Sequence, residues 1–344
     1  MQMFLQIAAI IIVVIVGGAA AFGFYNDYDV QKRGNGPLYN PDVPVLRTPD
    51  TRFEALTDFP FEPHYINIED PELGTLRVHY LDEGPADGEV ILLLHGQATW
   101  SYSYRKMIPA LTAAGYRVVA PDLVGFGRSD KPADWEVHTF QKQVDWLGAT
   151  LAQLNIYNCN AFLFDWGGYF ALRLLAEDPQ LFSRLILVTT TMPRANSLFA
   201  AAWVAGWRRY IYGPEEFPIS GMVSQMTGTE TDELTLTGLD APYPNEAYKG
   251  GPRRMPLMIP ATTLHPAARP NRAAWKKLKG WDGPALTLLA ESIAKRGFNP
   301  KEFYDQLPGT AGQPHQIYPD MGFFLIEDVP EELAAATLTF IEQN

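Results

Sequence analysis

The sequence has little cysteine and comparatively few charged residues. Cys159 is the only cysteine among 344 residues, which excludes an internal disulfide and a thiolate metal cluster. Charged residues make up 19% of the chain and hydrophobic residues 47%, a balance typical of a folded protein rather than a disordered one. No HExxH or comparable ligand spacing, phosphate loop or dinucleotide fingerprint occurs, so we expect neither a metal nor a cofactor.

Basic residues are in the minority. The chain has 27 basic against 39 acidic residues, with a formal net charge of -12, and it contains no basic run with interleaved aromatics. Such a chain would be repelled by phosphate backbones, which argues against nucleic acid as a partner.

The N-terminal segment is the longest apolar run in the chain. Residues 3 to 24 contain no charge, and Gln6 is their only strongly polar member, so the run is long enough to span a bilayer. We therefore expect a transmembrane anchor over residues 1–24, with the membrane as a partner, and a polar linker over 25–45. A cleaved secretory signal is the alternative, because residues 19–21 resemble a cleavage site; the protein would then be secreted or periplasmic. Lys32 and Arg33 are too few to decide which membrane face carries the domain.

The remainder alternates between buried-strand and helix patterns. Continuous apolar runs typical of strands buried on both faces alternate with segments of helical periodicity. This alternation predicts an α/β fold with a mostly parallel sheet and helices on both of its faces. The expected strands are residues 65–69, 76–81, 90–94, 117–120, 161–164, 185–189, 284–290 and 315–318, and the expected helices 104–114, 139–154, 168–176 and 331–342.

The alternation stops between residues 192 and 282. Four aromatic residues, Trp203, Trp207, Tyr210 and Tyr212, lie close together there in a stretch that favours a helix. We therefore expect a helical cap over 192–282, inserted into a core formed by residues 46–191 and 283–344.

The most informative local pattern is Phe164-Asp165-Trp166-Gly167-Gly168, between an expected strand and an expected helix. A nucleophile elbow has this outline, because its sharp turn needs small neighbours and lifts the side chain at its apex clear of the backbone. Asp165 would occupy the apex, although an aspartate there could instead simply cap the helix. His95-Gly96-Gln97 follows another strand, and the backbone N–H of Gln97 is expected to supply an oxyanion-type donor to the same site.

Several stretches resemble the haloalkane dehalogenases whose halide site is a pair of tryptophans. They are HGQATWSYSYRKMIPAL from His95, APDLVGFGRSDKP from Ala120, DWGGYFALRL from Asp165, and later GPRRMPLMIP and NRAAWKKLKGWD. The likeness runs from about Val45 to the C-terminus. It implies an α/β-hydrolase fold with a helical cap, and attack by Asp165 on a carbon that carries chlorine, bromine or iodine. The expected ligands are a small apolar, halogenated substrate and a halide ion.

The chemistry suits these residues. An ionised carboxylate displaces halide without a base, and an indole N–H in a dry pocket is a suitable donor for the departing anion. The resemblance assigns halide binding to Trp166 and Trp207, with Trp203 as the alternative for the second. Gln97 stands where the subfamily often has Glu, a change that leaves its backbone donor intact.

The resemblance fails at the general base. The family places a His within Gly-His-Phe after the last strand, whereas this chain has Gly322-Phe323-Phe324, so Phe323 stands at the base position. The family's orienting Asp aligns with Ile293. Glu291 lies two residues earlier and, on an extended segment, could face the same way as a substitute acid. Hydrolysis of an alkyl ester on Asp165 is therefore expected to be slow or blocked.

Another histidine could replace the missing base. His315 lies eight residues before Phe323 at the start of a strand, more than about 10 Å from the catalytic edge, and we reject it. His265, in the cap, stays open as a candidate. The others are most simply structural: His64, His79, His95 and His138.

Three functions fit the sequence. The first is a haloalkane dehalogenase-type hydrolase with impaired turnover. The second is a catalytically inactive ligand-binding protein, or a single-use scavenger alkylated at Asp165. The third is an epoxide hydrolase, which shares the fold and the nucleophile and needs cap tyrosines, for which Tyr210 and Tyr212 are available. The pairing of Trp166 with Trp207 favours halide.

Overall fold

The computed structural model describes residues 18, 21, 27, 44–195, 198–212, 214–295 and 306–344. In these parts of the chain, no helix is both long and apolar enough to cross a bilayer. The expectation of a membrane-anchored protein is corrected accordingly. The segment on which it rested, residues 3 to 24, lies outside the described residues apart from Gly18 and Ala21.

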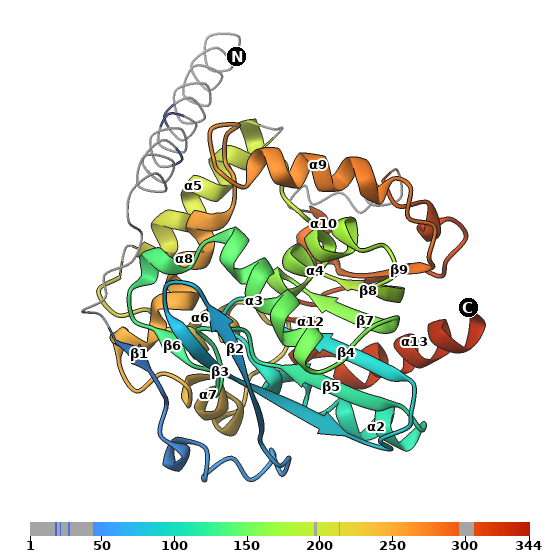
Figure 1. Cartoon of the computed structure of the whole chain (residues 1–344), viewed down its shortest axis with the longest axis horizontal. Helices are drawn as coiled ribbons and strands as arrows, with labels where there is room; N and C mark the ends of the chain where they lie inside the picture. The colour runs from blue at the N-terminus through green and yellow to red at the C-terminus, as the bar shows by residue number, and fades with distance from the viewer. Residues whose placement is uncertain are drawn as a thin grey trace, which may run out of the picture.

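A central sheet of eight strands organises the molecule (Figure 1). Its order is β10-β9-β8-β7-β4-β5-β3-β2; the strands from β10 to β5 pair in parallel, whereas β3 is antiparallel to both β5 and β2. The mostly parallel sheet expected from the sequence is thus confirmed. The strands are β2 (His64–Asp70), β3 (Gly74–Glu83), β4 (Val90–Leu94), β5 (Arg117–Pro121), β7 (Cys159–Phe164), β8 (Phe182–Val188), β9 (Ala285–Ala290) and β10 (Gln316–Tyr318), and β1 (Val45–Leu46) pairs separately with β6 (Lys131–Pro132).

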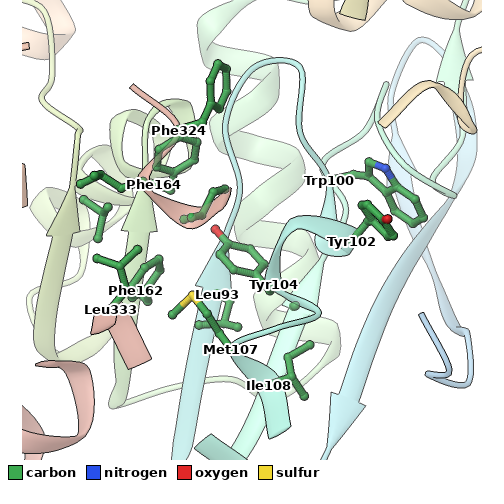
Figure 2. Packing of buried hydrophobic residues seen from close by; sticks show 14 of the residues in the cluster. Leu93, Trp100, Tyr102, Tyr104, Met107, Ile108, Phe162, Phe164, Phe324 and Leu333 are labelled. Carbon is green, nitrogen blue, oxygen red and sulfur yellow. The ribbon is translucent and has the colours of Figure 1, made fainter. Parts of the chain in front are cut away.

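Helices cover both faces of this sheet. Along β4, Leu92 and Leu94 point to one apolar cluster and Ile91 and Leu93 to the other, because successive strand residues face opposite sides. The first cluster includes residues of α3 (Phe140–Gln153), α4 (Trp166–Glu177) and α9 (Ala268–Leu278). The second includes residues of α2 (Ile108–Ala113), α12 (Leu325–Asp328) and α13 (Pro330–Gln343), and Figure 2 shows part of it around Leu93.

The helix expected over 104–114 is divided. A short 3-10 helix, η2 (Ser101–Tyr104), precedes α2, and Pro109 occupies the first turn of α2. Proline lacks the backbone N–H that a continuing helix would need, but it is well suited to a first helical turn. Pro109 therefore fits the first turn of a new helix, which begins at Ile108.

The segment between β8 and β9 is mainly helical. It contains α5 (Leu198–Tyr212), α6 (Ile219–Met226), α7 (Glu233–Asp240) and α8 (Gly250–Met258), followed by α9. α6 contacts α7 and α5 contacts α8, whereas α9 packs against α4 of the core. The domain boundaries inferred from the sequence stay a prediction.

Candidate active site

Asp165 stands at a strained turn between β7 and α4. Its backbone has φ 47° and ψ -120°, a conformation that residues other than glycine rarely adopt. A Cβ at Gly96 would lie 2.4 Å from the Asp165 carboxylate, and a Cβ at Gly167 would lie 2.6 Å from the Leu94 carbonyl. The Thr190 hydroxyl donates to the Asp165 carbonyl at 2.6 Å. Asp165 makes no helix-capping hydrogen bond, so simple capping does not explain this residue.

The carboxyl group of Asp165 is buried beside backbone donors. Gln97 N–H donates to Asp165 Oδ2 at 2.9 Å, as expected for the loop after β4. Burial raises the pKa of Asp165 from its usual 3.8 to about 7, and the backbone N–H groups of Gln97 and Trp166 oppose that rise by stabilising the charged form. A raised pKa on a carboxyl held by directed donors is typical of a functional site.

The two tryptophans assigned to halide binding flank Gln97 and Asp165. Trp166 follows Asp165 directly, is buried, and its ring lies 4.9 Å from that of Tyr169. On α5, the indole N–H of Trp207 donates to Gln97 Oε1 at 3.3 Å, a long hydrogen bond. Gln97 thus contacts Asp165 through its backbone and Trp207 through its side chain. The side chain of Trp203, the alternative halide ligand, lies outside the described residues.

Gln97 has a fixed amide orientation. Its Nε2 donates to the Pro252 carbonyl at 2.8 Å, which leaves Oε1 to accept from Trp207. The neutral amide can therefore satisfy a donor on one side and an acceptor on the other. A glutamate at this position could not donate to Pro252 while ionised.

Phe323 packs beside the elbow. Its ring centroid lies 5.8 Å from that of Phe164, the residue before Asp165, and 5.2 Å from that of Phe324. Phe323 N–H donates to the Met226 carbonyl at 2.6 Å, which joins this loop to the end of α6. A Cβ at Gly322 would lie 2.1 Å from the same carbonyl, so the two segments can approach this closely only because Gly322 has no side chain.

The position expected for an orienting acid is also apolar. Ile293 is 8% exposed and belongs to the same buried cluster that Phe323 and Phe324 contact. Glu291 opens the short helix α10 (Glu291–Lys295) directly after β9, rather than lying on an extended segment as the sequence suggested. Side chains two positions apart on a helix project about 200° apart, so Glu291 does not face the same way as Ile293.

Neither His265, which stayed open as a candidate, nor His315, which was rejected from the sequence, offers a free ring nitrogen. His265 Nδ1 accepts from Ala267 N–H at 3.1 Å, and its Nε2 lies 2.8 Å from the Leu257 carbonyl. Burial lowers the pKa of His265 to about 4, so the ring is neutral near pH 7. His315 is engaged in the same way by Thr287 N–H and the Thr310 carbonyl. This geometry argues against both as a replacement base.

The sequence reasoning assigned no role to Tyr104. This residue of η2 is fully buried, its hydroxyl has no hydrogen-bond partner, and its ring lies 5.9 Å from that of Phe162 (Figure 2). Burial raises the pKa of Tyr104 well above its usual value, and the charge of Asp165 raises it further. In the sequence, a tyrosine within an apolar run predicts core packing. Only its proximity to Asp165 in the folded structure indicates that Tyr104 belongs to the candidate site.

Comparison with known proteins shows the class of protein to which the chain belongs. Residues 89–252 match the family model described as the alpha/beta hydrolase fold. The chain is 43% identical over 300 residues to a haloalkane dehalogenase of Psychrobacter cryohalolentis, covering 87% of this chain and 99% of that protein. It is 40% identical over 296 residues to a haloalkane dehalogenase of Mycolicibacterium paratuberculosis, covering 86% and 98%. The chain belongs to the haloalkane dehalogenase family.

A solved structure agrees with this assignment. The tetrameric haloalkane dehalogenase DpaA from Paraglaciecola agarilytica superimposes with a TM-score of 0.75 at 32% sequence identity. The match covers 86% of this chain and 98% of that one. The common architecture therefore extends across nearly the whole of that enzyme.

Proposed function

We propose that the protein is a haloalkane dehalogenase-type hydrolase that alkylates itself at Asp165 and releases the product slowly or not at all. The observation that carries the proposal is the Asp165 carboxyl group, which is buried, lies on a strained elbow and has Oδ2 held by Gln97 N–H. Trp166 and Trp207 would bind the departing halide. Small apolar halogenated molecules are the substrate class.

The first half-reaction needs no general base. An oxygen of the Asp165 carboxylate forms a bond to the halogen-bearing carbon, and the electron pair of the carbon–halogen bond leaves with the halide. Before reaction, the Trp207 indole N–H donates to Gln97 Oε1 at 3.3 Å. A halide could exchange for this weak neutral acceptor at little cost, because a charged acceptor makes the stronger hydrogen bond.

The second half-reaction, hydrolysis of the alkyl ester, lacks a proton acceptor at the position where the family has its histidine base. Water must attack the ester carbonyl carbon and lose a proton. The bond between that carbon and the alkyl-bearing oxygen then breaks, which releases the Asp165 carboxylate and an alcohol. The Phe323 ring, packed against Phe164, cannot take that proton. General-base help is typically worth about 100 to 10,000-fold, so the ester should persist.

A single-use alkyl acceptor is the second candidate function. The apolar character of both positions, Phe323 and the buried Ile293, favours it, because a trapped ester is then the end of the reaction. The epoxide hydrolase alternative is less well supported. Tyr210 is 38% exposed, its ring stacks on that of Trp207 at 5.4 Å, and its hydroxyl donates to Gln225 Oε1 at 3.2 Å and is therefore already engaged. The side chain of Tyr212 lies outside the described residues.

Intact-protein mass spectrometry with a short bromoalkane tests the proposal. We expect the full-length chain to gain one alkyl group, with one bromide released per chain, and Asp165→Asn to gain none. Sustained bromide release without an adduct would show that another group supplies the base. Folded protein that gives neither an adduct nor bromide would contradict the alkylation step itself and leave ligand binding as the function.

A further inference from the structure

Arg208 is a buried cation next to the proposed halide ligand. It is 1% exposed on α5, where it directly follows Trp207. Its Nε donates to the Pro256 carbonyl at 3.1 Å and its Nη2 to the Ile259 carbonyl at 2.8 Å. These bonds attach α5 to the C-terminal end of α8.

The counterion of Arg208 comes from a residue that precedes the first strand that the structure describes, β1. Asp27 is fully buried, and its Oδ1 accepts from Arg208 Nη2 at 2.9 Å. Its other oxygen accepts from Thr262 N–H, in the segment that follows α8. A single carboxylate therefore joins α5 to the segment after α8, across sequence separations of 181 residues to Arg208 and 235 residues to Thr262.

This ion pair constrains the rotation of α5. Consecutive helix residues project about 100° apart, so Arg208 can be held on one side while Trp207 faces Gln97 on another. The bond between Trp207 and Gln97 is long, at 3.3 Å, and the ring on which the Trp207 indole stacks, Tyr210, belongs to α5 itself, so both contacts depend on how α5 is held. Removing one partner of a buried ion pair leaves an uncompensated charge, which the surrounding structure relieves by moving.

We propose that Asp27 is a positioning residue for the halide site, acting through Arg208 to orient Trp207. The inference rests on the proposed function in that Trp207 is taken to bind halide. It assigns a part in the halide affinity of the site to a residue that lies before β1 in the sequence.

The test uses the full-length chain with bromide as the probe. The dissociation constant is measured by quenching of tryptophan fluorescence, and Trp207→Phe identifies the signal from that residue. We expect Asp27→Ala to weaken bromide binding at least tenfold and Asp27→Asn, which keeps the shape but not the charge, to weaken it less. Arg209→Ala, an exposed neighbour on the same helix, is the matched control and should change nothing.

A second background separates positioning from general loss of stability. Replacing Arg208 by Met removes the cation with a flexible apolar side chain of similar length. If Asp27 acts through Arg208, adding Asp27→Ala to Arg208→Met should change bromide affinity less than twofold. A further tenfold loss would overturn the proposed route.

Hydrogen exchange makes the result independent of halide binding. Peptides from α5 should exchange faster in Asp27→Ala than in the unaltered chain, while peptides from α9 should not. If the unaltered chain fails to bind bromide, the proposed role of Trp207 fails and exchange alone decides whether Asp27 holds α5. A folded Asp27→Ala protein with unchanged bromide affinity and unchanged exchange in α5 would overturn the inference.

Discussion

Replacing the Asp165 carboxyl by an amide should stabilise the fold in a pH-dependent manner. Burial raises the pKa of Asp165 from 3.8 to about 7 in the folded protein. Folding therefore favours the protonated form. Well below pH 3.8 the carboxyl group is protonated in both the folded and the unfolded state, so it does not change the free energy of unfolding. As the pH rises towards 7, the unfolded state ionises first and the folded protein loses stability.

The size of the effect follows from the pKa difference. A rise from 3.8 to about 7 corresponds to about 4 kcal/mol of destabilisation above pH 7, since each pKa unit is worth about 1.4 kcal/mol. At pH 5 the same group destabilises by only about 1.6 kcal/mol. Asp165→Asn cannot ionise, so its stability advantage over the unaltered chain should grow by about 2.5 kcal/mol between pH 5 and pH 8.

Urea denaturation at pH 5, 6, 7 and 8 measures this difference. Effects of the substitution that do not depend on ionisation, such as altered packing or hydrogen bonding to Gln97, cancel when the two pH values are compared. Asp87→Asn, at an exposed loop position, is the control and should show no such trend. A stability difference between Asp165→Asn and the unaltered chain that stays constant from pH 5 to pH 8 would refute the argument that Asp165 is desolvated.

Three further predictions concern the reaction. The rate of Asp165 alkylation should rise about tenfold between pH 6 and pH 8 and then level off, because only the carboxylate attacks and its pKa is about 7; a flat profile from adduct formation against pH would contradict this. Phe323→His should raise bromide release in steady state by up to about 100-fold, and adding Ile293→Asp should raise it further, since an imidazole works best with an orienting acid. No gain from the double variant would show that hydrolysis is limited elsewhere. Gly96→Ala should abolish adduct formation in a folded protein, because its Cβ would lie 2.4 Å from the Asp165 carboxylate; an adduct of normal yield would exclude that contact.

The sequence determined the sheet and the elbow to a large extent. Continuous apolar runs such as Val90–Leu94 have no polar face, so they fit only strands covered on both sides, and the expected strands agree with the structure to within a few residues. The elbow could be recognised at Asp165 because its requirements are local: a strand, an apex residue and glycines. The membrane anchor is the expectation that was corrected: apolar length alone supported it, and among the described residues no helix could span a bilayer.

Only the tertiary structure decided how distant residues combine. The sequence could not show that Gln97 bonds to both Asp165 and Trp207, because those bonds join two loops and a helix that lie far apart in the sequence. The commitment of both ring nitrogens of His265 to backbone groups likewise depends on the path of a loop. Asp27 and Arg208 lie 181 residues apart in the sequence, and no periodicity or motif indicates that they form an ion pair. Strands and turns could be predicted because burial and backbone geometry depend on residues that are neighbours in the sequence. The partner of a buried charge could not be predicted, because it depends on how the whole chain packs.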